Sequence, residues 1–340
     1  MKKRKLSLLA VLALAVSLTA CGNKDSKEAD KPAEGEKAPT ETVEVAGDWK
    51  PEENISTIVA YKAGSGTDTT ARILSEYANK YLGQTMVIEN LEGGSGSIGW
   101  TRLAESKNDG YTIGYVNLPT LASNIVEGLA NYSMDDFIPI ANHVKETSLI
   151  VVSAKSEFNT LEDLVKYAKE NPGVLKASTN GNKASNHIGA ELFAQSAGFE
   201  YTPISYGGTA DQLLALRQNE VDFTSAKEAD IASMMDEVKV LGVFSEERLE
   251  AFPDVPTLKE SGYYDKWYGS ARAIAAPKGT PAEVIKFYEE AFKQAMEDPD
   301  YLEAAKKAGV TTDFRNSEET AKLFDQQFQF VNEEVSKLWK

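Results

Sequence analysis

The spacing of apolar and polar residues predicts that strands and helices alternate along most of the chain. Residues 55–61 (ISTIVAY) are rich in β-branched and aromatic side chains, which is typical of a strand. Between residues 71 and 81 apolar side chains recur at intervals of three and four, so they lie on one face of a helix that ends at Gly83. The same patterns predict further strands over 85–89, 112–116, 148–152, 176–179, 201–206, 221–225, 238–244 and 268–275. They predict further helices over 99–106, 161–170, 185–197, 209–219, 231–237, 281–297, 300–308 and 317–338.

This alternation indicates an α/β fold, in which helices are layered on parallel sheets. The length of 340 residues is enough for about two domains of ~100–200 residues each. The strand over 148–152 is expected to cross into a second domain, and the strand over 268–275 is expected to return to the first.

Composition narrows the classes of function that such a fold can serve. Hydrophobic residues make up 42% of the chain, enough for a substantial core, and the formal net charge is −16. This acidity argues against a nucleic-acid partner, because phosphate binding needs a basic surface. The single cysteine excludes a disulfide framework, and with only two histidines we expect neither a metal site nor a metal cofactor.

The N-terminus has the pattern of an export signal with a lipid attachment point. Residues 2–5 are basic, and the apolar run that follows is too short to span a bilayer as a stable helix. The only cysteine, Cys21, comes directly after the small residues that end this run, which resembles a bacterial lipobox. We interpret 1–20 as a lipoprotein signal peptide and Cys21 as a lipidated residue that anchors the protein to the membrane at the periplasmic or cell-surface side. The alternative is an ordinary signal peptide with an incidental cysteine. Residues 21–47 are poor in apolar side chains, which predicts a flexible tether.

Three loops of small residues each follow a predicted strand and precede a predicted helix. They cover 63–68 (AGSGTD), 178–187 (STNGNKASNH) and 206–210 (YGGTA). Such loops present backbone N–H groups and the positive end of a helix dipole, an arrangement that suits an anion such as a carboxylate. The alternative is that they are simple turns whose polar residues, Thr67 or Asp68, Ser185 and Thr209, cap the helices.

Nucleotide-binding and catalytic motifs are poorly matched. Residues 94–99 contain a G-x-G-x-x-G-like spacing, but no acidic residue follows about 20 positions later, as a dinucleotide site requires. No G-x-S-x-G motif is present. Ser185 and His187 lie close together in sequence, so a hydrolase that uses this pair remains an open alternative. We assign no catalytic residue.

Several motifs occur in an order and spacing that resemble one protein family. The motifs are YKAGSGTD over 61–68 with TAR over 70–72, LGQ over 82–84, VIEN over 87–90, GGSGSIG over 93–99, DGYT over 109–112, DFIPI over 136–140, NPG over 171–173, His187 with AELF over 190–193, YGG over 206–208, PDVPT over 253–257, WYG over 267–269 and APKGTP over 276–281. Together they make the chain similar to the extracytoplasmic solute-binding proteins of tripartite tricarboxylate transporters, also called the TctC or Bug family, over about 55–335.

The resemblance implies a two-lobed, periplasmic-binding-protein-like (Venus flytrap) fold with two crossings between the lobes. Lobe 1 is expected to cover 48–147 and 273–340, and lobe 2 to cover 148–272. It implies a monomeric receptor, not an enzyme, that binds a small carboxylate between the lobes without a cofactor. The ligands of the family include dicarboxylates, tricarboxylates, aromatic acids and amino acids, and its partners are integral membrane permease subunits.

The resemblance also implies which residues contact the ligand. Carried over by position, they are Gly64, Ser65, Gly66, Thr67, Asp68, Asn117, Pro119, Thr120, Thr179, Asn180, Ser185, Asn186, His187, Tyr206, Gly207 and Gly208. Four basic residues depart from the family pattern or adjoin these loops and are either counter-charges for a carboxylate or solvated side chains, namely Lys62, Lys183, Lys227 and Arg272. Arg272 is the one that we include among the expected ligand-binding residues, because its strand is expected to span the two lobes.

Two functions are compatible with such a cleft. The first is capture of a carboxylate and its delivery to a membrane permease, and the second is a sensing module that presents the ligand to a signalling receptor. Both require the same closure on a ligand, so the sequence leaves them open. For Asp68 we expect a helix-capping role in preference to contact with a ligand amino group.

Overall fold

The computed structural model describes residues 49–339, which fall within one compact unit of the chain. The expected signal peptide, the expected lipidation at Cys21 and the expected tether lie outside the described residues. Among the helices that are described, none is both long and apolar enough to cross a membrane.

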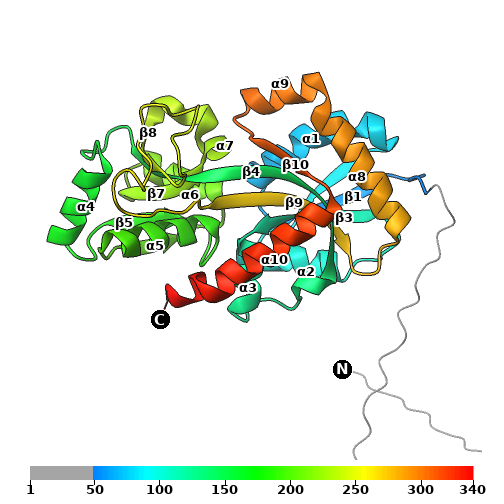
Figure 1. Cartoon of the computed structure of the whole chain (residues 1–340), viewed down its shortest axis with the longest axis horizontal. Helices are drawn as coiled ribbons and strands as arrows, with labels where there is room; N and C mark the ends of the chain where they lie inside the picture. The colour runs from blue at the N-terminus through cyan, green and yellow to red at the C-terminus, as the bar shows by residue number, and fades with distance from the viewer. Residues whose placement is uncertain (1–48, 340) are drawn as a thin grey trace, which may run out of the picture. The chain divides into compact units, whose positions relative to one another are not determined.

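Strands and helices alternate through the described residues, so the predicted α/β class is confirmed (Figure 1). The strands are β1 (Ile55–Val59), β2 (Met86–Asn90), β3 (Thr112–Leu118), β4 (Phe137–Ser153), β5 (Lys176–Thr179), β6 (Thr202–Ser205), β7 (Phe223–Lys227), β8 (Val238–Val243), β9 (Gly269–Pro277) and β10 (Thr312–Arg315). The α-helices are α1 (Gly66–Leu82), α2 (Ser97–Ala104), α3 (Thr120–Val126), α4 (Leu161–Glu170), α5 (Ser185–Ala197), α6 (Thr209–Arg217), α7 (Glu228–Ile231), α8 (Ala282–Glu297), α9 (Pro299–Lys307) and α10 (Ser317–Glu333). The 3-10 helices are η1 (Gly94–Gly96), η2 (Met134–Asp136), η3 (Ala232–Glu237) and η4 (Val335–Lys337).

The strands form one continuous sheet, in the order β2-β1-β3-β9-β4-β7-β5-β6, and β8 and β10 also pair with β4. Strands β1, β2 and β3 are parallel to one another, as are β5, β6 and β7. The prediction of parallel sheets does not hold at the centre, where β9 pairs antiparallel with both β3 and β4, and β7 pairs antiparallel with β4. The reason is that the chain runs out along β4 and returns beside it along β9, and neighbouring strands of opposite direction must pair antiparallel.

Strand β4 is long enough to belong to two parts of this sheet. Its residues up to Thr147 pair with β9, whereas those from Ser148 onward pair with β7 and β8. We call β1, β2, β3, β9, β10 and the start of β4 the first half, and β5, β6, β7, β8 and the end of β4 the second half. Figure 1 shows β4 and β9 running side by side through the middle of the described residues.

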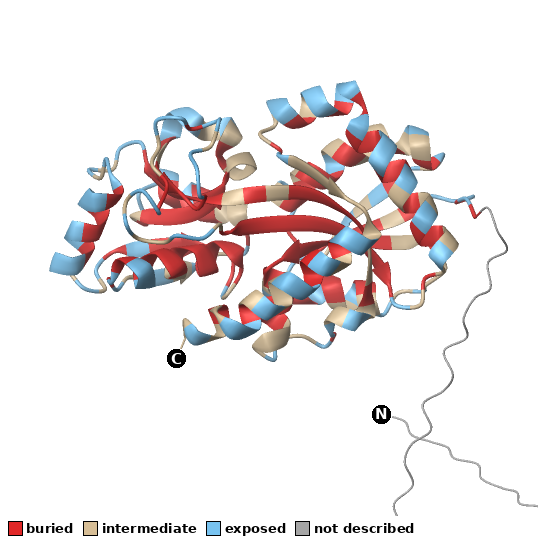
Figure 2. Cartoon of the chain, in the orientation of Figure 1, coloured by how far each residue is buried: buried red, intermediate tan, exposed pale blue. Residues whose placement is uncertain are grey.

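The end of β4 separates two hydrophobic cores of the second half. Ile150 and Val152 belong to a core with Phe193 and Phe223, whereas Leu149 and Val151 belong to another with Leu216. Alternate residues of a strand point to opposite faces of the sheet, so helices cover this half on both faces. A third core, around Trp100 and Tyr288, lies in the first half. Figure 2 shows β4 and β9 mostly buried, with the exposed residues on the outward sides of the helices.

The C-terminal segment adds a further connection between the halves. Helix α10 follows β10 of the first half, but Val331 at its end and Val335 in η4 pack in the core of the second half. The Trp339 ring lies 4.6 Å from the ring of His187, and the carbonyl of Leu338 accepts a hydrogen bond from Gln195 Nε2 at 2.7 Å. The end of the described chain is therefore attached to α5.

His143 is a fully buried histidine between two tyrosines of the first half. Its Nδ1 lies 3.0 Å from the Tyr115 hydroxyl, and its Nε2 lies 2.7 Å from the Tyr301 hydroxyl. Burial, reinforced by the positive charge of Arg272, lowers the pKa of His143 from 6.5 to about 3. The imidazole is therefore neutral in the folded protein, and it joins the two hydroxyls as donor to one and acceptor from the other.

We expect the substitution His143→Gln to make stability less sensitive to acid. The pKa of His143 is lower in the folded state than in the unfolded state, so its contribution is present above pH 6.5 and is lost as the pH falls towards 3. In wild type this loss is about 1.4 kcal/mol for each pH unit below 6.5. Urea unfolding at pH 7 and pH 5 measures the change in the free energy of unfolding for wild type and variant. If the free energy of unfolding fell equally between pH 7 and pH 5 in wild type and variant, His143 would not be a neutral buried histidine. Each protein is compared with itself at the two pH values, so the packing cost of the substitution cancels.

Candidate functional site

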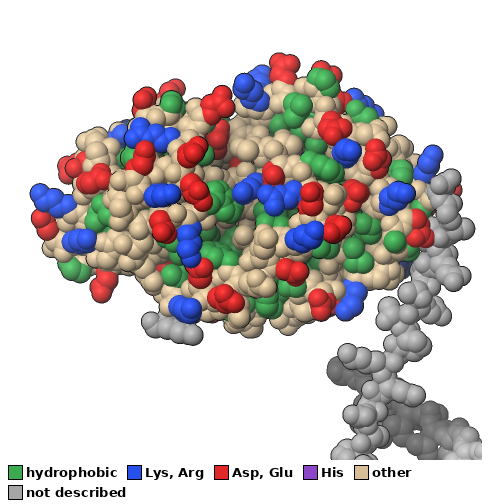
Figure 3. Space-filling view, in the orientation of Figure 1, with side chains coloured by type: hydrophobic (Ala, Val, Ile, Leu, Met, Phe, Trp, Pro, Cys, Tyr) green, Lys and Arg blue, Asp and Glu red, His purple; other side chains and the backbone are tan. Residues whose placement is uncertain are grey.

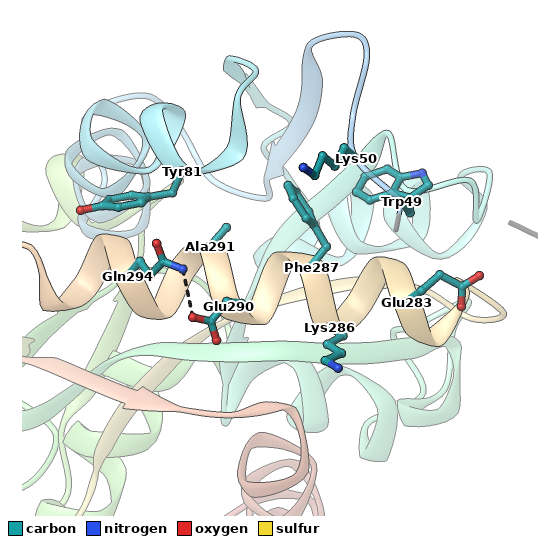
Figure 4. Close-up of a pocket in the computed structure, with 9 residues that line it drawn as sticks. All are labelled: Trp49, Lys50, Tyr81, Glu283, Lys286, Phe287, Glu290, Ala291 and Gln294. Atoms are coloured by element: carbon teal, nitrogen blue, oxygen red, sulfur yellow. Dashed lines mark hydrogen bonds between the residues drawn. The ribbon is translucent and has the colours of Figure 1, made fainter. Parts of the chain in front are cut away.

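One cavity of about 370 Å³ lies on the outside of the first half, against α1 and α8. Figure 4 shows Trp49 and Phe287 along it, with Glu290 hydrogen-bonded by Gln294 at 2.9 Å. Its charged side chains are exposed at the surface, apart from the half-buried Glu283, so water screens them. Acidic and basic side chains are likewise interspersed over the face in Figure 3. We therefore look for the functional site elsewhere, where charged groups are buried.

A second, polar cavity lies where the two halves meet. It is lined by Tyr61, Ser65, Gly66, Thr67, Asn117, Asn180, Ser185, Asn186, Thr209, Lys227, Asp230, Ser270 and Arg272. We call this set the cleft. Side chains fill most of it, leaving about 20 Å³, which is room for about one water molecule.

The cleft collects the N-termini of three helices because each helix follows a parallel strand. Helix α1 follows β1, α5 follows β5 and α6 follows β6, and the first residue of each, Gly66, Ser185 and Thr209, lines the cleft. The positive dipole ends of these helices therefore face one small volume. This convergence suits an anion, and a carboxylate in particular.

The caps of these helices differ slightly from the prediction. Ser65, and neither Thr67 nor Asp68, caps α1, by accepting a hydrogen bond from the backbone N–H of Asp68 at 3.3 Å. Ser185 and Thr209 are the first residues of α5 and α6, and they follow cap positions that provide no side-chain hydrogen bond. At α5 the backbone N–H groups of Ser185 and Asn186 donate instead to Thr120 Oγ1, at 3.0 Å, and to Asn180 Oδ1, at 3.2 Å. The start of α6 has no side-chain cap, so its backbone donors remain for another partner.

Beside the cleft lies a roomier cavity of about 260 Å³. Gly66, Thr209 and Asp230 line both spaces, so these residues form the boundary between them. Leu213 and four alanines supply much of the remaining wall, and Lys307 at the end of α9 also lines it. The cleft therefore adjoins a space that takes a small, partly apolar group.

A cluster of four buried charges occupies the cleft and its wall. Arg272 on β9 forms an ion pair with Glu146 on β4, and its Nη2 lies 3.9 Å from Asp230 Oδ1. The side chains of these three residues are 0–4% exposed. Lys227, at the end of β7, is 1% exposed. Burial of unpaired charge is costly, so a cluster of this kind requires that each charge be matched.

Lys227 is held by a network of polar side chains in the second half. Its Nζ donates to Asn186 Oδ1 at 2.5 Å, and Asn186 Nδ2 donates to Gln212 Oε1 at 3.0 Å. Gln212 Nε2 in turn donates to the Ser225 carbonyl at 2.8 Å. Burial lowers the pKa of Lys227 to about 8, and the negative charges of Asp230 and Glu146 oppose this shift. Burial also raises the pKa of Glu146, against the influence of Arg272.

Gly66 is required for the close approach of these groups. A Cβ built on Gly66 would lie 2.8 Å from Arg272 Nη2 and would also overlap Asp230 Oδ1. The Asp230 carboxylate, which comes from the second half, therefore lies directly against the start of α1 in the first half. The same carboxylate accepts a hydrogen bond from the backbone N–H of Lys227 through Oδ2 at 2.9 Å.

The structure brings together about half of the residues that the sequence predicted as ligand contacts. Those in the cleft or the adjoining cavity are Gly64, Ser65, Gly66, Thr67, Asn117, Asn180, Ser185, Asn186 and Arg272. Those that line neither space are Asp68, Pro119, Thr120, Thr179, His187, Tyr206, Gly207 and Gly208. Contact of any of them with a ligand stays a prediction.

Several residues outside the cleft instead hold its loops in position. Asp68 accepts hydrogen bonds from Gly64 N, at 2.9 Å, and from Arg72 Nε, at 3.0 Å. Burial alone would raise the pKa of Asp68, but these hydrogen bonds outweigh it and lower the pKa. Thr120 Oγ1 accepts a hydrogen bond from Ser185 N at 3.0 Å, across the two halves.

The geometry does not form a Ser-His catalytic pair. His187 Nδ1 accepts a hydrogen bond from the backbone N–H of Lys183 at 2.9 Å, and the other side of its ring faces Trp339. Neither ring nitrogen is hydrogen-bonded to the Ser185 hydroxyl in the described residues. The same residues contain no group of three or more histidine, cysteine or acidic side chains placed to hold a metal ion.

Sequence reasoning missed the acidic part of the site. Asp230 and Glu146 were not singled out, and Tyr61, Thr209 and Ser270 were not among the expected ligand contacts. Lys227 was one of four basic candidates, and its position after a strand that ends beside the glycine-rich loops was the signal for it. No local pattern marks Asp230 or Glu146 among 52 acidic residues.

Comparison with known proteins relates this chain to one family of transporter receptors. A model of the tripartite tricarboxylate transporter family of receptors matches residues 70–337. A UPF0065 protein encoded in the gbd 5' region of Cupriavidus necator is 30% identical over 289 residues, which cover 84% of this chain and 86% of that protein.

Solved structures resemble the described fold over most of their length. The periplasmic binding protein BugD has a TM-score of 0.78 and 28% identity, with 85% of this chain and 98% of BugD covered. MatC of Rhodopseudomonas palustris, solved with bound malate, has a TM-score of 0.78 and 24% identity, with 83% of this chain and 98% of MatC covered. The predicted periplasmic-binding-protein-like, two-lobed fold is thereby confirmed.

Proposed function

The chain belongs to the tripartite tricarboxylate transporter family of receptors, and from this membership we propose that it is an extracytoplasmic solute-binding protein for a small carboxylate. The carboxylate binds in the cleft and is delivered to a membrane permease. No chemical step on the ligand is part of this function. The family's description as transporter receptors favours delivery over presentation to a signalling receptor.

The observation that carries this proposal is the convergence of three helix N-termini on one buried polar cleft. The first residues of α1, α5 and α6 all line it, together with the cationic side chains of Lys227 and Arg272. Local donors of this kind bind an anion even in a protein with a net charge of −16, because distant surface charges are screened over about 8–10 Å. The malate bound by MatC is a ligand of the expected chemical class.

Binding is proposed to involve separation and closure of two lobes, with lobe 1 over 48–147 and 273–340 and lobe 2 over 148–272. The cleft offers only about 20 Å³, so a carboxylate is admitted when the lobes move apart. Strands β4 and β9 are the segments that connect the lobes, and bending there is the natural hinge. The ligand then shifts the population towards a closed form that surrounds it.

The proposed location is outside the cytoplasmic membrane. BugD, which resembles this chain at 28% identity, is a periplasmic binding protein. A lipid anchor on Cys21 would keep the receptor close to its permease, and residues 22–47 would give the folded part reach. The anchor, the permease subunits and a monomeric state are proposals.

We expect small carboxylates to raise the melting temperature of the protein in a thermal-shift assay. A ligand at 100 times its Kd stabilises the folded state by about 2.7 kcal/mol. The panel contains mono-, di- and tricarboxylates, aromatic acids and amino acids, and isothermal titration measures the Kd of each compound that gives a shift.

The variant Gly66→Ala tests whether the cleft is the site. Its Cβ overlaps the positions of Asp230 and Arg272, so we expect closure to be impaired and affinity to fall at least tenfold. Glu76→Ala, on the exposed side of the same helix, serves as the control and keeps wild-type affinity. If no carboxylate shifted the melting temperature, or if Gly66→Ala bound normally, the proposed function or its site would be wrong.

A further inference from the structure

The buried charges of the cleft carry information about the class of ligand, if the cleft is the carboxylate site proposed above. Two cations, Lys227 and Arg272, and two acids, Glu146 and Asp230, are present there. A site built only for di- or tricarboxylates needs surplus positive charge, because several negative charges are brought out of water together. The formal charges of this cluster sum to zero. A ligand with no net charge can therefore bind there without leaving any charge uncompensated.

Within residues 49–339 each acid has one oxygen without a hydrogen-bond partner, but the two oxygens differ in their distance from a cation. Glu146 is ion-paired with Arg272 and also accepts a hydrogen bond from Ala229 N at 3.3 Å. Asp230 uses Oδ2 to accept the Lys227 backbone N–H, but its Oδ1 has no hydrogen-bond partner there and is 3.9 Å from Arg272 Nη2. A buried carboxylate oxygen without a hydrogen bond is costly and calls for a donor.

The position of Asp230 makes that oxygen accessible to a ligand. Asp230 lines both the cleft and the adjoining cavity of about 260 Å³, and its Oδ1 lies against Gly66 at the start of α1. A ligand carboxylate at the helix N-termini would therefore have the Asp230 carboxylate as a close neighbour. Two carboxylates repel each other there, unless the ligand also places a positive charge between them.

We propose that the ligand is a zwitterion, a small carboxylic acid that bears a cationic amino group close to the carboxylate. The carboxylate accepts from the helix N-termini, Lys227 and Arg272, and the ammonium donates to Asp230 Oδ1. The remaining carbon atoms extend into the adjoining cavity beside Leu213. An ammonium group has three donors and no acceptor, so it satisfies an acceptor that a plain carboxylate leaves unpaired.

Matched pairs of ligands test this proposal by titration calorimetry on the full chain. The pairs are alanine with propionate, valine with 3-methylbutanoate, and leucine with 4-methylpentanoate, and the members of each pair differ only by the amino group. We expect wild type to bind the amino member of at least one pair tenfold or more tightly than its partner. A loss of about 10- to 100-fold for that amino acid is expected in Asp230→Asn, which keeps the size of the side chain but removes its charge. The affinity for the plain acid should not fall.

Asp236→Asn is the matched control, because Asp236 is an exposed aspartate on η3 of the second half and lines neither cavity, so its loss should change neither affinity. If plain acids bound wild type as tightly as their amino partners, the zwitterion proposal would be overturned while the proposed function stood. Unchanged amino-acid affinity in Asp230→Asn would overturn it as well. If no member of any pair bound, the zwitterion proposal would be overturned, and the proposed function would fail with it only if every other carboxylate of the thermal-shift panel also failed to bind. Should Asp230→Asn not fold, the comparison of each pair on wild type still decides.

Discussion

Replacing Arg272 by methionine is expected to lower the free energy of unfolding by about 3–5 kcal/mol at neutral pH. The guanidinium is 4% exposed and is ion-paired with Glu146, whose side chain is 0% exposed. Removing one partner of a buried pair leaves the other charge without water or a counter-charge, and this costs more than the lost packing. Urea unfolding followed by tryptophan fluorescence measures the change.

A second substitution separates the lost charge pair from the lost packing. The double variant Glu146→Gln/Arg272→Met removes both charges, so we expect it to recover at least half of the stability lost by Arg272→Met. Acid should have a similar effect on the single variant, because a protonated Glu146 is cheaper to bury than an ionised one. A double variant as unstable as the single one, or a loss that does not shrink below neutral pH, would show that packing dominates at this position.

A disulfide between the two halves is expected to abolish ligand binding reversibly. Ser95 Oγ donates to the carbonyl of Asn182 at 3.1 Å, and a Cβ built on Gly181 lies 3.4 Å from the Ser95 Cβ. This is close to the spacing of about 3.5–4.5 Å that a disulfide requires. The pair Ser95→Cys/Gly181→Cys in a Cys21→Ser chain, which has no other cysteine, would hold the cleft at its small volume.

Calorimetry under oxidising and reducing conditions checks this expectation. The oxidised pair should bind none of the carboxylates that wild type binds, and reduction should restore binding. Each single cysteine variant is the control, and its affinity should not depend on the reductant. Gly181 has φ +134°, so a cysteine there adds backbone strain of about 1–3 kcal/mol. The stability of the reduced pair, which has the cysteine but no disulfide, measures this strain separately. Full binding by the oxidised pair would mean that the ligand reaches its site without separation of these loops.

Elements with a strong local pattern were predictable in detail. The bounds predicted for 161–170, 176–179 and 185–197 are those of α4, β5 and α5. Helix α3 was not predicted, because it is largely buried, with polar Thr120 and Asn124 inside as well as apolar residues, so no polar face alternates with an apolar one. Strand β10 was missed because it is short and its pairing with β4 is irregular.

Sequence patterns predicted the helix N-termini of the candidate site but not its acidic residues. Glycine, serine and threonine after strands indicate helix N-termini at the edge of a sheet, and this pattern leads to Gly66, Asn180 and Ser185. Glu146 and Asp230 are distant in sequence and lie near each other only because β4 and β7 pair antiparallel. A pattern that assumes parallel strands cannot bring those two residues together.

The attachment of the C-terminal segment to α5 has a practical consequence for any experiment on this protein. Trp339 and Leu338 are anchored on the second half, although the helix that leads to them starts on the first. A tag, dye or surface linker fused at this end would thus disturb the contact between the C-terminal segment and α5, and with it the relative movement of the two halves and the measured affinities. Exposed positions in the middle of α8, such as Lys293, are better points of attachment for immobilised or labelled protein.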